Sequence, residues 1–292
     1  MATGSTEIVG AKSSTTALLV RRIVCYTVLT IFAIISLFPF VILIVNMTRS
    51  TSQIAKGFTL IPGSNFIKNF VKVMNNHDWK MLSSLRNSLI ISGFAALLST
   101  YFSALTAYAI HVYDFKLRKP AFTFILMIMM VPTQVTALGF VKLVNNMNLV
   151  NSFIPLIIPS IAAPATFFFM KQYMESSLPL DIVEAARIDG SGEFRTFNSL
   201  ILPILKPAIA VQAIFTFVTS WNNYFIPALI LDDKNRRTLP IVIGIIRSAD
   251  YAKFDMGAVY MAIGISIIPV AIVYLVLSKF IIRGIAIGSV KG

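Results

Sequence analysis

Residues 181–207 read DIVEAARIDGSGEFRTFNSLILPILKP and form a polar stretch between two long apolar ones. Seven of these residues are charged, although only 13% of the whole chain is charged. Soluble domains carry about 25% charged residues. A chain that is 57% hydrophobic, with a mean hydropathy of +0.80, has too little polar surface for a water-solvated domain. The composition therefore predicts an integral membrane protein in which residues 181–207 lie outside the bilayer.

The net charge of +13 does not indicate a nucleic-acid-binding protein. The basic residues are scattered through the breaks between apolar runs and do not gather in one stripe. The chain has one cysteine, Cys25, inside an apolar run, which excludes a disulfide framework and a cysteine metal cluster.

Six stretches lack Asp, Glu, Lys and Arg for about 20 residues or more, which is long enough to cross a bilayer core of roughly 30 Å. They are Ile23–Thr48, Asn87–Ile110, Ala121–Val141, Leu143–Met170, Pro207–Leu231 and Met256–Ser278. The predicted fold is all-α and polytopic, with six transmembrane helices in one domain over residues 16–292. Residues 1–15 show no apolar period and are predicted to be a disordered tail.

The orientation follows only weakly from charge. With the N-terminus inside, thirteen of the 25 basic residues face the cytoplasm, so the raw count is nearly even. The basic residues that directly abut spans, Arg21, Arg22 and the turn 116–119, favour an N-inside topology.

The chain lacks the sequence signatures of several chemistries. There is no G-x-x-x-x-G-K-[ST] phosphate loop, no H-E-x-x-H metal site and no G-x-S-x-G nucleophile. We therefore expect no enzyme activity, no metal site and no cofactor in this chain. The six spans also contain no ionisable acidic or basic residue, which argues against an ion-coupled carrier and leaves a passive channel open.

The polar stretch predicts a helix–turn–helix. Pro179 and Asp181 suit the start of a helix that ends at Ile188, and Gly190 can take the positive φ that closes it. Ser191 is expected to cap a second short helix that ends before Pro203. A helix resting on lipid headgroups would carry a Lys/Arg-rich face, but residues 171–206 hold four basic and five acidic residues. Docking of a protein therefore fits better.

The same stretch resembles a known family signature. The pattern E-A-A-x3-G-x9-I-x-L-P is typical of the permease subunits of bacterial ABC importers, and this chain departs from it only at Leu200. The neighbouring sequence, together with NSLIIS (87–92), MVPTQVTALGF (130–140), SWNNYFIPALI (220–230) and GSVKG (288–292), resembles the carbohydrate branch and the inner-membrane permeases of maltose transporters.

The resemblance implies that the loop 173–206 is cytoplasmic and carries a coupling helix, between spans four and five, that docks on an ATPase. The implied coupling residues are Glu184, Ala185, Ala186, Asp189, Gly190, Leu202 and Pro203, and the implied C-terminal contacts with the ATPase are Gly288 and Lys291. It further implies a bacterial plasma-membrane location with both termini cytoplasmic. The implied partners are a second permease, two ATPase subunits that bind ATP and Mg, and an extracellular binding protein.

Polar and aromatic residues inside two spans are candidates for the transport pathway. Aromatic faces and amides suit a neutral sugar, and they occur together at Trp221, Asn222, Asn223 and Tyr224, with Gln134 in the third span. Amides that join helices and an interfacial aromatic belt are the alternatives. The predicted function is an ABC importer permease for a sugar or oligosaccharide. The alternatives are an importer of another neutral solute or a glycerol-phosphate type of substrate, a channel or carrier outside the ABC class, and a membrane enzyme.

Overall fold

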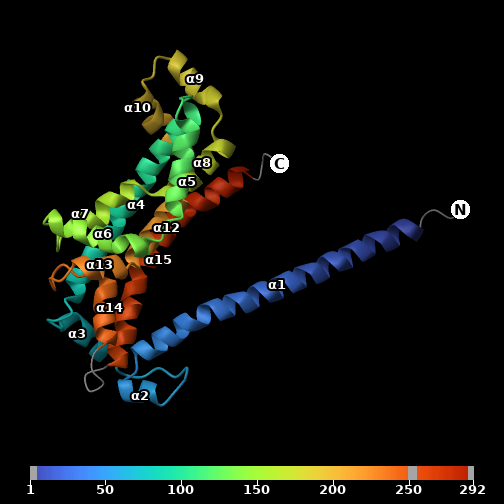
Figure 1. Cartoon of the computed structure of the whole chain (residues 1–292). Coiled ribbons are helices and arrows are strands. Elements are labelled where there is room, and N and C mark those ends of the chain that lie inside the picture. The colour runs from blue at the N-terminus through green and yellow to red at the C-terminus, as the bar shows by residue number, and fades with distance from the viewer. Residues whose placement is uncertain (1–4, 249–254, 289–292) are drawn as a thin grey trace. The chain divides into compact units, whose positions relative to one another are not determined.

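The computed structural model describes residues 5–248 and 255–288, with side chains described for 17–248 and 255–281, and every regular element in these ranges is a helix (Figure 1). The longest helices are α1 (Ser5–Met47), α4 (Met81–Val112) and α15 (Met256–Gly288). Those of intermediate length are α3 (Phe66–Asn75), α5 (Arg118–Met129), α6 (Thr133–Asn146), α8 (Pro164–Ser177), α9 (Leu180–Ile188), α12 (Lys206–Trp221) and α14 (Leu239–Arg247). The short ones are α2 (Thr51–Ala55), α7 (Ile154–Ile157), the 3-10 helix η1 (Ile158–Ile161), α10 (Glu193–Thr196), the π-helix η2 (Phe197–Ile201), α11 (Leu202–Ile204) and α13 (Phe225–Ile230).

Four helical segments are long and apolar enough to cross a membrane unbroken, namely Ala17–Met47, Met81–Val112, Ile154–Ser177 and Met256–Ile281. Two bent pairs bring the total to six if each is one span. The first joins α5 and α6 at 95°, and the second joins Glu193–Ile204 to α12 at 81°. The all-α, polytopic class is confirmed. The predicted third span, residues 121–141, is divided into α5 and α6 around Pro132, which lacks the N–H for a helical hydrogen bond and biases the preceding residue away from helical angles.

The chain divides into two units, which are described separately: unit 1 is Met1–Phe70 with Asp255–Gly264, and unit 2 is Val71–Phe254 with Ile265–Gly292. In unit 1, helix α1 begins at Ser5, whereas the sequence predicted a disordered tail over residues 1–15. Residues 5–15 contain no proline, and extending an existing helix costs far less than nucleating one. At the other end of α1, buried Arg49 donates to the side chain of Asn46 and to the carbonyls of Gly57 and Gln53.

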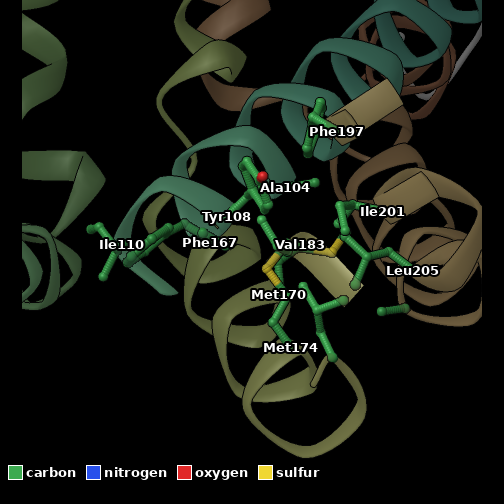
Figure 2. Packing of buried hydrophobic residues seen from close by; sticks show 13 residues of the cluster. Ala104, Tyr108, Ile110, Phe167, Met170, Met174, Val183, Phe197, Ile201 and Leu205 are labelled. Atoms are coloured by element: carbon green, nitrogen blue, oxygen red, sulfur yellow. The ribbon is translucent and has the colours of Figure 1, made fainter. Parts of the chain in front are cut away.

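Unit 2 is built around α4, whose buried face carries small residues that allow close helix packing. These are Ser84, Ser88, Ser92, Ala95, Ala96, Ser99, Ser103 and Ala107. Ser99 donates to Thr166 of α8 over 3.1 Å, which joins the two helices through a buried hydrogen bond. The largest described core of this unit combines side chains of α4, α8, α9, η2 and the start of α12 (Figure 2). In Figure 1, α9 and α10 lie at one end of unit 2, and α13 and α14 lie toward the other.

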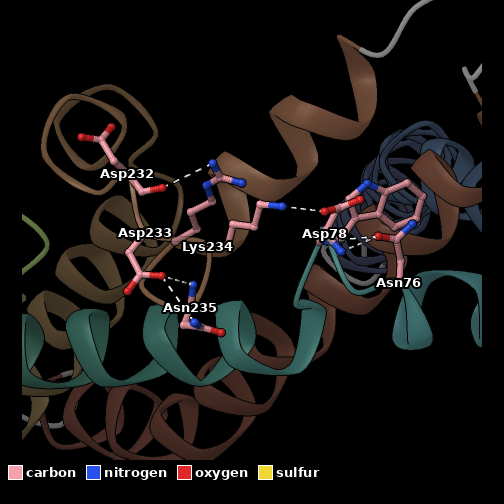
Figure 3. Close-up of polar contacts among 8 residues, drawn as sticks. Asn76, Asp78, Asp232, Asp233, Lys234 and Asn235 are labelled. Atoms are coloured by element: carbon pink, nitrogen blue, oxygen red, sulfur yellow. Dashed lines mark hydrogen bonds and ion pairs between the residues drawn. The ribbon is translucent and has the colours of Figure 1, made fainter.

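The loop before α14 is anchored to the first turns of α4. The Asn87 amide donates to the carbonyls of Asn235 and Arg237, and the hydroxyl of Ser88 accepts from the Leu239 amide over 2.8 Å. Figure 3 shows the same loop joined to the turn before α4, where Lys234 pairs with Asp78 over 2.6 Å. These bonds give a structural role to the NSLIIS motif and hold the start of α14 against α4.

Candidate functional site

The first candidate site is the segment from α9 to α11, here called the coupling element. Helix α9 ends with Asp189 as its C-cap, and Gly190 has φ +74°. The Ser191 amide donates to the Ala186 carbonyl and the Gly190 amide to the Arg187 carbonyl, over 2.9 and 3.0 Å. This pair of bonds is a Schellman motif, in which a residue of positive φ satisfies the last carbonyls of a helix. The predicted helix end and the positive φ of Gly190 are therefore confirmed.

The second half of the element differs from the sequence prediction in two respects. The N-cap of α10 is Gly192 and not Ser191, whose hydroxyl instead accepts from Thr196 over 2.9 Å. The helix also does not end before Pro203. It widens into the π-helix η2 and continues through α11, where Pro203 stands in the first turn. Pro203 has no backbone N–H and cannot donate to the turn before it, and the helix passes this residue directly after the wider π turn.

The coupling element has one buried face and one exposed face. Val183, Ala186 and Phe197 are buried, and Figure 2 shows Val183 beside Met170 and Met174 of α8. Residues 184, 185, 189 and 190 are exposed, as are two large apolar side chains, Ile188 at 86% and Phe194 at 71%. Ala186, at 4% exposed, faces its own chain and is not part of the open surface, because its place in the helix puts it on the same side as Val183.

Leu202 and Pro203 lie elsewhere in the element. They line a cavity of about 340 Å³ together with Leu97, Thr100, Tyr101, Asn198, Lys206 and Ile209, most of which belong to α4 and α12. The sequence placed these two residues with the coupling residues, but the structure separates them from the exposed positions on α9.

A cluster of polar side chains, here called the polar cluster, joins the coupling element to α4. Arg187 pairs with Glu193 across the turn over 2.7 Å, and Glu193 accepts a hydrogen bond from the Tyr108 hydroxyl of α4 over 3.1 Å. The Arg187 guanidinium also lies 5.5 Å from the ring centre of Tyr113, the C-cap of α4. The hydrogen bond with Glu193 raises the pKa of the Arg187 guanidinium above its ordinary value, so the pair stays charged at neutral pH. The sequence analysis missed this cluster, and the opposite charges on either side of the Gly190–Gly192 turn were the available signal.

The second candidate site is a cavity of about 340 Å³ in unit 2, here called the break cavity. It is lined by Trp221, Asn222, Tyr224, Leu239, Pro240, Ile243, Gly244, Arg247 and Ser266. Three of the five predicted pathway residues therefore come together, whereas Asn223 and Gln134 do not line it. Trp221 is buried at 2% exposed and stacks on Phe217 at 5.6 Å, so it forms a wall.

The residues 222–224, which the sequence analysis placed inside the fifth span, lie in a break between two helices. Helix α12 ends at Trp221 and α13 begins at Phe225. The cause is Pro227, because a proline ring clashes with the carbonyl four residues earlier, here that of Asn223. Asparagine side chains also compete for backbone hydrogen bonds and weaken a helix. The break leaves Asn222 and Tyr224 exposed.

Helix α14 forms the opposite side of the break cavity and lies outside the six spans that the sequence predicted. The available signal was Pro240 at the start of an apolar run, which is typical of a first helical turn. A Cβ atom at Gly244 would lie 3.0 Å from Cε2 of Tyr224, so the absence of a side chain lets the ring lie directly on the helix. Arg247 stands in the last turn and is exposed.

Neither candidate site, as the structure describes it, includes the two residues predicted to contact the ATPase from the C-terminal tail. Gly288 is the last described residue of α15, and Lys291 lies outside the described residues.

Comparison with known proteins gives one family match. A family model described as the binding-protein-dependent transport system inner membrane component matches residues 99–287. The arabinooligosaccharides transport system permease protein AraQ of Bacillus subtilis (strain 168) is 37% identical, covering 70% of this chain and 72% of that one. The trehalose/maltose transport system permease protein MalG of Thermococcus litoralis is 30% identical, covering 93% and 98%. The sn-glycerol-3-phosphate transport system permease protein UgpE of Yersinia pestis bv. Antiqua (strain Antiqua) is 31% identical, covering 90% and 95%.

The fold also matches a solved structure. A chain from the crystal structure of a bacterial ABC transporter involved in the import of the acidic polysaccharide alginate superposes with a TM-score of 0.74. The sequences are 22% identical, with 89% of this chain and 96% of the other covered, so this likeness shows a shared fold.

Proposed function

The chain belongs to the family of binding-protein-dependent transport system inner membrane components, and from that premise we propose that it forms the import pathway for a sugar or oligosaccharide. It is a multi-pass membrane permease and not an enzyme. Relatives at 30% identity or above are named for arabinooligosaccharides and for trehalose/maltose, which supports a carbohydrate cargo. As the membrane component of such a system, it works with an ATPase and with a solute-binding protein.

The proposed assembly contains this chain, a second permease, two ATPase subunits that bind ATP and Mg, and an extracellular binding protein. Both termini lie in the cytoplasm in this proposal, which puts the coupling element on the side of the ATPase. Gly288 and Lys291 stay predicted as further contacts of the C-terminal tail with the ATPase.

The observation that carries the docking proposal is the Schellman-closed end of α9 with its exposed outer face. Glu184 and Asp189 supply polar contacts, and Ala185 and Gly190 leave room for the partner's backbone. Large apolar side chains that are exposed on an element facing the aqueous phase are typical of protein interfaces. Ile188 therefore serves as an apolar anchor in the same interface.

The coupling element is well suited to transmit force because it is held at two levels. The apolar core beneath it fixes Val183 and Phe197 against α4 and α8, and the polar cluster ties its turn to the end of α4. Closure of the ATPase dimer around ATP would push α9, and α4 would move with it. Since α4 also packs along α8 and α12, such a push would reach the helices that form the pathway.

The proposal is tested by reconstituting the whole complex in lipid and measuring ATP hydrolysis that depends on the binding protein. A panel of oligosaccharides is added one at a time, together with a phosphorylated polyol and an amino acid. We expect stimulation by one class of carbohydrate only. Stimulation by the amino acid alone, or uptake that proceeds without the ATPase, would refute the proposed function.

A further inference from the structure

The break cavity is lined by a single residue that is charged at neutral pH, and that residue is a cation. Of its nine lining residues, Arg247 carries the only full charge at neutral pH, and no acidic residue contributes to the wall. Within the part of the chain that the structure describes, the Arg247 side chain has no hydrogen-bond or ion-pair partner. A guanidinium offers five donors and cannot be neutralised by losing its proton. An unpaired one at the wall of a cavity is therefore available to an anion.

The exposed polar groups around Arg247 are those that a sugar ring requires. Tyr224 presents an exposed aromatic ring whose Cε2 atom lies close to Gly244 of α14. Asn222 adds an exposed amide that both donates and accepts. The volume of about 340 Å³ lies at the small end of the roughly 300–1,000 Å³ typical of ligand pockets, which suits one sugar unit.

We propose that the break cavity is a subsite for an acidic sugar, in which Arg247 pairs with a carboxylate or phosphate group on the ring. This rests on the proposed function and narrows its substrate class from sugars in general to sugars that carry a negative charge. Tyr224 packs against the face of the ring and Asn222 bonds a hydroxyl, while the guanidinium binds two oxygens of the anionic group. The sequence analysis had favoured a neutral solute because its six predicted spans hold no basic residue, but Arg247 reaches this cavity from α14, outside those spans.

A second role for Arg247 has to be separated from this one. A cation in the last turn of a helix interacts favourably with the helix dipole and stabilises the helix end. Such a role would alter the stability of α14 without distinguishing one ligand from another. The test therefore measures the difference between charged and neutral ligands and not the binding of one ligand alone.

The experiment uses the purified permease–ATPase complex in nanodiscs without the binding protein, so that only the membrane subunits select the ligand. Three probes share one ring and differ only at carbon six: glucuronate, glucose 6-phosphate and glucose. We expect at least one of the two anionic probes to bind about tenfold more tightly than glucose, because hydrogen bonds to a charged group are stronger than those to a neutral hydroxyl. The two anionic arms then show whether the cavity prefers the carboxylate or the phosphate.

Three variants complete the test. Arg247→Gln should remove the preference for the anionic probe, and Arg247→Lys should retain part of it because the charge remains but the bidentate geometry is lost. Arg237→Gln is the matched control, because Arg237 is exposed in the loop before α14 and does not line the cavity. It should keep the full preference.

Equal binding of all three probes, binding of none, or a preference that persists in Arg247→Gln would overturn the subsite. The proposed function is tested in the same wild-type preparation by adding the binding protein and following ATP hydrolysis. Absence of that stimulation would refute the proposed function, whereas stimulation without any anionic preference would refute only the acidic-sugar subsite.

Discussion

The coupling element and the break cavity each lie where one helix ends and another begins, but the polar groups at the two helix ends are satisfied differently. At Gly190 the backbone satisfies its own carbonyls through the Schellman bonds, and Arg187 pairs with Glu193 across the turn. At residues 222–224 the helix is broken by Pro227, and the side chains of Asn222 and Tyr224 are left exposed. An element that satisfies its own polar groups keeps its shape under load. Exposed polar side chains at a helix break are free to form hydrogen bonds with a solute.

The two regions also differ in what lies beneath them. The coupling element rests on the largest described core of unit 2, where Phe197, Met170 and Met174 are almost fully buried. The break cavity is bordered instead by the end of α12 and by the short helix α14. The Asn87 amide holds the loop before α14, and the Ser88 hydroxyl holds its first residue, Leu239. We therefore expect substitutions in the first region to affect assembly and those in the second to affect solute selection.

The largest effect is expected from Gly190→Asp. A side chain at φ +74° costs about 1–2 kcal/mol for an L-residue, and the added carboxylate occupies the space that the partner needs. The variant should insert in the membrane but lose the ATPase on co-purification. Gly192→Asp is the matched control, because Gly192 is also exposed and has open space around its Cα, but its φ is −67°. Unchanged co-purification and transport in Gly190→Asp would contradict the docking role.

The next effect is expected from Ile188→Ser. This side chain is 86% exposed and makes no core contact, so its loss should leave the stability of the isolated permease unchanged. If it anchors the ATPase, the affinity of the permease for the ATPase should fall about tenfold, which corresponds to a hot-spot loss of more than 1 kcal/mol. Affinity is measured by titrating the ATPase onto the permease in nanodiscs. Leu117→Ser, which changes an apolar side chain that is 67% exposed and lies outside the coupling element, should have no effect on that affinity.

A smaller effect is expected from breaking the polar cluster with Glu193→Gln. The side chains of Arg187 and Glu193 are each about 40% exposed, so solvent screens their pairing and it contributes little to the stability of the protein. The ATPase should still bind, but more ATP should be hydrolysed per solute moved, because the turn is held less firmly to α4. A double-mutant cycle with Tyr108→Phe measures the energetic coupling across the 3.1 Å bond. Strictly additive effects on transport would show that the cluster has no part in transmission.

The smallest effect is expected from Gly244→Ala. The added Cβ would crowd the Tyr224 ring at 3.0 Å, and the ring can move because it is the end of a side chain. Transport should fall by less than about tenfold, under ~1.4 kcal/mol, with no change in ATPase co-purification. Loss of ATPase co-purification in this variant would contradict the assignment of assembly to the coupling element and of solute selection to the break cavity.

The sequence by itself determined the class of the molecule and the closed end of α9. Low charge and six long apolar runs sufficed for an all-α membrane protein, because the requirement to satisfy every backbone group in lipid leaves few alternatives. The end of α9 at Gly190 could also be predicted, because a glycine after a C-cap is a local signal that needs no distant partner.

The tertiary structure alone decided which residues meet. Ala186 is buried although it stands inside the E-A-A signature, Leu202 and Pro203 face a separate cavity, and only three of five predicted pathway residues line the break cavity. Arg247 and the polar cluster were missed because each depends on residues far apart in the sequence, such as Tyr108 with Glu193. Local propensity specifies where a helix ends, but which side chains it brings to a given cavity depends on how the helices pack. Helix packing depends on how the shapes of whole helix faces fit together, and this fit cannot be read from the order of residues along the chain.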